Sequence, residues 1–175
     1  FELDGLCTEL DNHRFLINLD MMGPLYGTST AVPFGDTDIA AATRLLANEL
    51  RYAITIRDQI VYSSDNMTFN HVGIPGISFY RGPFESVGGH TEEDTIKSCS
   101  PEGLAHIGKF IEAWIDRYVE SLHSFPFKRA LPDQAKSAVA KWFKGKDPLD
   151  YEVLGPAKKY AKGNSAGTSK SKAKR

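Results

Sequence analysis

The sequence contains only two cysteines, Cys7 and Cys99, which lie far apart among its 175 residues. So few cysteines argue against a disulfide scaffold and against a cysteine-rich zinc module. Two free thiols are expected, with a single bridge between them as the alternative. The sequence also lacks internal repeats and any apolar run near the roughly 20 residues of a membrane span. These absences favour one main globular domain without a membrane partner.

The N-terminal segment lacks the basic and then apolar layout of a signal peptide, which favours a cytoplasmic location. The chain opens with Phe1 rather than with methionine, so a targeting signal could precede the given sequence. The compartment is therefore left open.

Positive charge is concentrated at the C-terminal end of the chain. From Pro156 onward there are seven basic residues and no acidic residue. Since the net charge of the whole chain is -1, residues 1–155 carry about -8. The segment 156–175 is rich in Gly, Ser, Ala and Lys and has no apolar periodicity, so we predict a disordered basic tail. The acidic remainder argues against a nucleic-acid-binding domain.

Short apolar runs predict the strands of a buried sheet. The runs 15–19 and 77–80 are typical of buried strands, and residues 52–56 form either a further strand or the end of a helix. Residues 23–35 contain glycine and proline at several positions and are predicted to be a loop.

Helical spacing of apolar residues predicts three helices, over residues 36–51, about 100–122 and 131–143. Strands that alternate with helices favour an α/β fold with a mostly parallel, mixed sheet flanked by helices. We expect residues 1–125 to form the main α/β unit, with a helical C-terminal extension over residues 126–155.

Four polar residues lie at predicted strand ends or in the adjoining loops: Asp20, Asp65, His90 and Asp94. Carboxylate and imidazole groups that arrive from separate loops are the ligands of a catalytic zinc ion. Asp94 follows His90 by four residues and could orient its imidazole through a hydrogen bond. From the spacing alone, helix capping and surface hydrogen bonding remain alternatives for each of these residues.

Three stretches of the chain, taken together and in order, carry a resemblance to a known family. They are residues 17–23 (INLDMMG), residues 64–66 (SDN) with Phe69 and the turn 73–75 (GIP), and residues 90–95 (HTEEDT). Over about residues 14–120 they resemble consecutive signatures of the di-zinc aminopeptidases, peptidase family M28, of the aminopeptidase Y and bacterial leucyl aminopeptidase kind.

The resemblance implies a zinc-exopeptidase-like fold and a set of roles for these residues. Asp20 matches the carboxylate ligand of one zinc ion, and His90 matches the imidazole ligand of the other. Asp65 matches a carboxylate that supports the site. The complete enzyme would use two zinc ions to activate the water that hydrolyses the N-terminal bond of a peptide with a free amino terminus.

The departures from the family pattern imply that this chain is incomplete. The family's first zinc-binding His, its metal-bridging Asp and its Glu-Glu pair, which includes the general base, precede the INLDMMG motif. Only sixteen residues precede Ile17 here, and they contain neither a bridging-Asp motif nor a Glu-Glu pair. The chain is therefore expected to be the C-terminal half of such an enzyme, to contain no catalytic base, and to be inactive without the N-terminal half as its partner.

Two further functions fit the same resemblance. A glutaminyl-cyclase-like transferase shares the fold and uses one zinc ion, but the stretch Asn18–Met21 suits the peptidases better. A non-catalytic binding domain could have kept the fold and lost the site, although the presence of both Asp20 and His90 argues against it. Asn66 stands where many members of the family have His, and Gly89 precedes His90 where some have Tyr. No oxyanion-stabilising residue is assigned.

Overall fold

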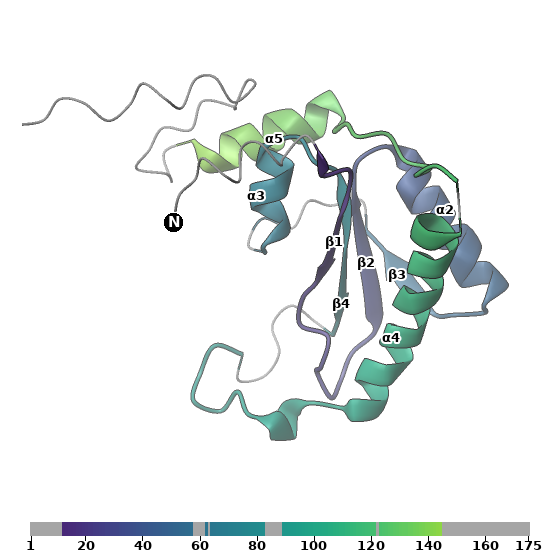
Figure 1. Ribbon diagram of the computed structural model, residues 1–175. Helices are drawn as coiled ribbons and strands as arrows, with labels where there is room; N and C mark the ends of the chain where they lie inside the picture. Colours follow the sequence, from purple (N-terminus) through teal and green to yellow (C-terminus); the bar gives the residue numbers. More distant parts are fainter. Residues whose placement is uncertain (1–11, 58–61, 63, 83–88, 122, 145–175) are drawn as a thin grey trace, which may run out of the picture.

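The computed structural model describes residues 12–57, 62, 64–82, 89–121 and 123–144 (Figure 1). Cys7 and the predicted basic tail over residues 156–175 lie outside the described residues. No helix in these ranges is both long and apolar enough to cross a membrane.

Four strands form one mixed sheet in the order β1-β4-β2-β3, and their bounds are β1 Leu16–Leu19, β2 Ser29–Phe34, β3 Ile54–Ile56 and β4 Gly76–Arg81. The pairs β1/β4 and β2/β3 are parallel, whereas β2 and β4 are antiparallel. Leu16 pairs with Gly76 and Leu19 pairs with Phe79, so β1 and β4 end at the same edge of the sheet. The predicted α/β fold with a mostly parallel, mixed sheet is confirmed.

The helices of the described chain are α2 Thr37–Glu49, α3 Asn66–His71, α4 Pro101–Ile115 and α5 Asp133–Phe143. Helix α4 runs on into a π-helical turn, Asp116–Glu120. Helices α2 and α4 each begin at a residue whose side chain caps the helix. At α2, the Asp36 carboxylate accepts a hydrogen bond from the Thr37 N–H over 2.7 Å. At α4, the Ser100 hydroxyl accepts a hydrogen bond from the Gly103 N–H over 2.9 Å.

The two faces of the sheet bury different clusters of side chains, because neighbouring residues of a strand point to opposite faces. Ala31, Ile77 and Phe79 face α2 and α4 and belong to the main core, while Val32 and Tyr80 face Leu131 and the start of α5. In Figure 1, α2 and α4 accordingly lie together on one side of the sheet, and α3 and α5 lie toward the other.

Trp114 on α4 forms the centre of the main core and is fully buried. Its ring stacks on Phe15 at a centroid distance of 5.7 Å and on Phe127 at 5.8 Å, and it contacts the edge of Phe79. The indole N–H donates to the hydroxyl of Thr43 on α2 over 3.1 Å. One side chain on α4 therefore joins the residue before β1, β4, α2 and the segment after α4.

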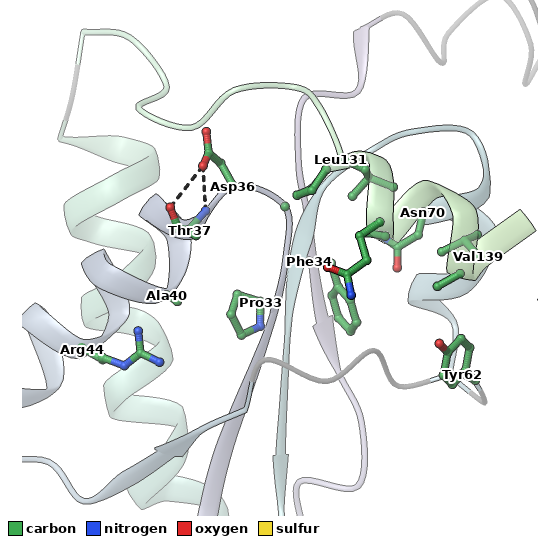
Figure 2. Close-up of a pocket in the computed structure, with 15 residues that line it drawn as sticks. Pro33, Phe34, Asp36, Thr37, Ala40, Arg44, Tyr62, Asn70, Leu131 and Val139 are labelled. Carbon is green, nitrogen blue, oxygen red and sulfur yellow. Dashed lines mark hydrogen bonds between the residues drawn. The ribbon is translucent and has the colours of Figure 1, made fainter.

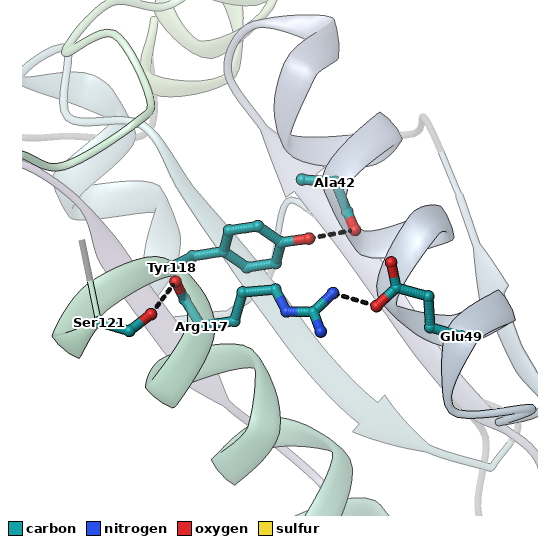
Figure 3. Close-up of polar contacts among 5 residues, drawn as sticks. All are labelled: Ala42, Glu49, Arg117, Tyr118 and Ser121. Atoms are coloured by element: carbon teal, nitrogen blue, oxygen red, sulfur yellow. Dashed lines mark hydrogen bonds and ion pairs between the residues drawn. The ribbon is translucent and has the colours of Figure 1, made fainter.

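A second group of polar contacts joins the end of α4 to α2 (Figure 3). The Tyr118 hydroxyl donates to the carbonyl oxygen of Ala42 over 2.8 Å, and Arg117 forms an ion pair with Glu49. The Ser121 hydroxyl donates to the carbonyl of Arg117 over 2.7 Å. Burial raises the pKa of Tyr118 above its ordinary value, so the phenol keeps its proton and remains a donor.

Two local predictions from sequence were wrong. Residues 23–35 were predicted to be a loop, but Ser29–Phe34 form the central strand β2. Pro33 is tolerated there because β3 pairs with β2 only as far as Ala31, which leaves one side of the strand open at Pro33. The loop through Asp65 contains the short helix α3, which the sequence reading did not predict.

Candidate metal centre at the end of β1

Asp20 lies directly after β1, at the edge of the sheet where β1 and β4 end. Its backbone N–H donates to the carbonyl of Phe79 over 3.1 Å, which continues the β1/β4 ladder by one residue. Met21 then turns the chain away with a φ of 47°, a left-handed value that is uncommon for a residue with a side chain. The half-buried Asp20 carboxylate is thus carried on a rigid strand end.

The Asp20 carboxylate is held by a chain of side-chain hydrogen bonds. The Ser64 hydroxyl donates to Oδ2 of Asp20 over 2.6 Å. The Asn18 amide in turn donates to the Ser64 Oγ over 2.8 Å and to the Ser78 Oγ of β4 over 3.1 Å. Because Asn18 and Ser78 are buried in the sheet, this network fixes the orientation of a carboxylate at the surface.

Sequence reasoning did not identify Ser64 and Asn18 as part of the site. Two signals could have indicated them. Asn18 precedes Asp20 by two residues in a strand and therefore lies on the same face of the sheet. Ser64 immediately precedes Asp65, which the family resemblance identified as a carboxylate that supports the metal site.

Asp65 itself lies at the N-terminal end of α3, with an exposed side chain that makes no capping hydrogen bond. Its carbonyl oxygen accepts a hydrogen bond from the Thr68 hydroxyl over 2.9 Å. The residue beside it, Ser64, makes the direct contact with Asp20. The proposed support by Asp65 remains a prediction.

His90 lies in the segment before α4, is exposed, and has a φ of 63°. Asp94 is also exposed, and its backbone N–H donates to the carbonyl of Thr91 over 3.1 Å. Within the described ranges no hydrogen bond joins the His90 imidazole to Asp94. The orienting role of Asp94 and the ligand roles of Asp20 and His90 therefore stay predictions.

The segment after Asp20 and the segment after His90 are joined through their main chains. The Leu25 N–H donates to the carbonyl of Ser98 over 2.7 Å, and the Ser100 N–H donates to the carbonyl of Gly23 over 2.8 Å. An isolated bridge pairs Pro24 with Cys99 between these two bonds. The two loops that carry the candidate ligands are thus fixed to one another.

Arg81, at the end of β4, donates hydrogen bonds to the loop that follows Asp20. Its backbone N–H donates to the carbonyl of Met21 over 3.2 Å, and its guanidinium donates to the carbonyl oxygens of Pro24 and Leu25. The guanidinium packs against Gly103 in the first turn of α4, where a side chain would collide with it. Glycine at this position lets α4 approach Arg81 closely.

We predict that Gly103→Ala destabilises the chain by about 1 kcal/mol, because the new methyl group would lie 2.6 Å from Cζ of Arg81 and would displace the guanidinium from the loop carbonyls to which it donates. Gly108→Ala in the same helix is the matched control. Its methyl group would have no neighbour within 4 Å, so the better helix propensity of alanine should stabilise the chain by about 0.5–1 kcal/mol. Urea unfolding of both variants measures the difference, and equal effects would contradict the close packing of Arg81 on Gly103.

The donor types of Asp20 and His90, a carboxylate and an imidazole, are those that zinc accepts. Among the described residues, however, no three His, Cys, Asp or Glu side chains come close enough together to hold a metal ion. The described part of the chain therefore fits a contribution to a zinc site but does not assemble a complete site.

Residues 5–115 match Peptidase family M28. The chain belongs to this family. The match covers β1 through α4 and ends at Ile115, so that α5 lies beyond it. No curated protein and no solved structure matches the chain. Membership of Peptidase family M28 supports a zinc-dependent peptide hydrolase in general terms.

Proposed function

We propose that this chain is the C-terminal half of a two-zinc aminopeptidase, to which it contributes Asp20 as a ligand of one zinc ion and His90 as a ligand of the other. The observation that carries the proposal is the hydrogen bond from Ser64 to Asp20, which holds a carboxylate at the end of a buried strand. Metal ligands are typically oriented in this way by a second hydrogen-bonded group.

Each residue of the chain has a limited part in the proposed reaction. When bound, the two zinc ions would supply a hydroxide and polarise the scissile carbonyl. Ser64 occupies one oxygen of Asp20 and so directs the other toward the metal position. Asp65 and Asp94 support the site from its periphery. The general base and the remaining ligands come from the other half of the enzyme.

The outer edge of β1 supports the expectation of a complementary half. The Leu16 N–H donates to the carbonyl of Pro75, just before β4, and the Asp20 N–H donates to that of Phe79 in β4. The peptide groups of Ile17 and Leu19 therefore face away from β4. Within the described ranges β1 pairs with β4 alone, and Leu19 is 54% exposed. A strand in which three of four residues are apolar, as in β1, is typical of a sheet interior. We infer that a strand of the N-terminal half pairs here, next to Asp20.

Zinc stoichiometry tests the proposal. Elemental analysis should find close to no zinc on the 175-residue chain and about two ions on the polypeptide that extends it by the residues encoded upstream. The extended protein should also release N-terminal residues from peptides. Two tightly held zinc ions on the short chain, or an extended protein without zinc, would overturn the assignment.

A further inference from the structure

An open groove of about 590 Å³ lies between strand β1 and helix α4. Leu19 of β1 lines it and pairs with Phe79, which belongs to the main core. Since paired residues of neighbouring strands point to the same face of a sheet, the Leu19 side chain lies on the face that α2 and α4 cover. The groove is therefore on that face, beside Leu19 and next to Asp20 at the end of β1.

A larger hollow, of about 730 Å³, lies between α2 and α5 (Figure 2). Phe34 lines this hollow and pairs with Gly76 at the start of β4, whereas Asp20 bonds to Phe79 near the end of β4. The hollow is thus at the opposite end of the sheet from Asp20, and no residue of β1 lines it. The groove, in contrast, borders the edge of β1 where the N-terminal half is inferred to pair.

Helix α4 has apolar residues on two of its sides. Ile107, Phe110 and Trp114 are buried in the main core. A second stripe repeats at helical spacing and lines the groove, and its members are Leu104, Gly108, Ile111 and Ile115. Leu104 is nevertheless 49% exposed, and Leu19 on the other wall of the groove is 54% exposed. A helix with so wide an apolar surface is typically packed against neighbours on more than one side.

The relative widths of helices and strands indicate what the neighbour is. Strands are spaced by about 4.8 Å and packed helices by about 8–10 Å, so one helix covers about two strands. Helices α2 and α4 thus suffice for the four strands β3, β2, β4 and β1. A strand added beside β1 extends the same face of the sheet and requires a further helix next to α4. The groove is at the position of that helix.

The charge along the groove is of one sign. Glu112, Asp116 and Glu120 line it at intervals of four residues, and all three are exposed. Within the described ranges no ion pair involves any of them, and like charges at this spacing repel one another. Lysine or arginine side chains on the neighbouring helix would convert this repulsion into attraction.

Gly108 leaves the middle of the stripe open. A side chain at this position would meet nothing within 4 Å, so the fold of the described residues does not require glycine here. Glycine also lowers the stability of a helix relative to alanine. A glycine at such a position is favourable when another backbone approaches it closely.

We propose that the groove binds an amphipathic helix of the N-terminal half of the enzyme. Its apolar face packs over Leu19, Leu104 and Ile115, its backbone approaches Gly108, and its basic residues face the row of acidic side chains on α4. The inference rests on the proposed function only in requiring that an N-terminal half exists.

The reactivity of an introduced thiol tests the proposal. Gly108→Cys is made in the 175-residue chain and in the polypeptide extended upstream, with Cys7 and Cys99 replaced by serine in both. A maleimide should label it at least about tenfold more slowly in the extended protein, because the helix covers it there. Lys109→Cys is the matched control: Lys109 is exposed, does not line the groove, and should be labelled alike in both proteins. Mass spectrometry of the α4 peptide identifies the labelled thiol.

A substitution of an exposed leucine gives a second measurement. Leu104→Gln should lower the thermal midpoint of the extended protein by at least about 2 °C more than that of the 175-residue chain, because Leu104 is buried by the helix only in the extended protein. Leu45→Gln, at a 56% exposed position of α2 outside the groove, should shift both midpoints alike. If Gly108→Cys fails to fold, this comparison decides the question.

Three results would overturn the proposal. The first is equal labelling of Gly108→Cys in the two proteins. The second is protection that appears in the 175-residue chain as its concentration rises, which would identify a second copy as the occupant. The third is protection in that chain at every concentration, which would identify a segment of the chain itself.

Zinc content and aminopeptidase activity, measured on the same samples, separate this proposal from the proposed function. An extended protein that protects Gly108→Cys but holds no zinc would refute the two-zinc aminopeptidase and support the docked helix. An active two-zinc protein in which Gly108→Cys stays fully reactive would refute the docked helix alone.

Discussion

Asp20→Ala and His90→Ala are each expected to remove zinc and peptidase activity together from the complete enzyme. Each substitution deletes one ligand of one proposed ion, and a two-metal site acts on its substrate through both ions. Loss of a partner that only orients a ligand costs about 10–100-fold in metal affinity or activity, so loss of a ligand itself should cost at least about 100-fold. Elemental analysis and the rate of release of an N-terminal residue measure the two effects.

Two further variants make this prediction specific. Asp65→Ala should lower activity while more metal stays bound, because Asp65 is proposed to support the site without holding an ion. Asp38→Ala, in the exposed first turn of α2, should leave both zinc content and activity unchanged. Full activity in the Asp20 or His90 variant would refute the site. An Asp65 variant as poor in zinc as the His90 variant would make Asp65 a ligand.

Trp114→Ala is expected to lower the free energy of unfolding of the chain by about 3–5 kcal/mol, the usual cost of removing a large aromatic side chain from a core. Trp114 is fully buried among Phe15, Phe79 and Phe127 and also donates to Thr43, so its removal leaves a cavity where five segments meet. Total stabilities of about 5–15 kcal/mol are usual for single domains, which makes the expected loss a large fraction of the whole. Denaturant unfolding followed by circular dichroism measures it.

Trp142→Ala provides the matched control for this prediction. Trp142 is half-buried and stacks on Tyr62 at the rim of the molecule, so its loss should cost about 1 kcal/mol. Trp114→Phe should recover part of the lost stability, because most of the buried volume is kept. A Trp114→Ala variant as stable as the Trp142→Ala variant would show that the core is not centred on α4.

The strands and helices that sequence predicted best are those whose signals are local. Residues 15–19 and 77–80 are mainly apolar runs, each with one polar residue. Helices α2 and α4 begin at residues that cap helices through their own side chains. Strand β2 was missed because Gly27, Pro33 and Gly35 are loop signals, and only the pairing with β4 shows that the residues between them form a strand.

The candidate site could be predicted only in part for a related reason. Asp20 stood out as a carboxylate after a buried strand, but its partner Ser64 is 44 positions away and reaches it through the packing of α3 beside β1. Likewise, burial on α2 could not be read from residue type alone. Leu45 and Leu50 are exposed although they are large and apolar, while Thr43 is buried and its hydroxyl accepts a hydrogen bond from Trp114.

The two main-chain hydrogen bonds between the loops that follow Asp20 and His90 have a consequence for the evolution of this chain. Every amino acid except proline provides the same N–H and C=O groups, so the distance between the two loops does not depend on which side chains occupy residues 23–25 and 98–100. Side chains such as the exposed Leu25 and Cys99 can therefore diverge among relatives while the loops keep their spacing. The position of Leu25 should therefore tolerate many residues but exclude proline, whose ring nitrogen carries no hydrogen to donate. Ser100 is restricted further, because its hydroxyl also caps α4.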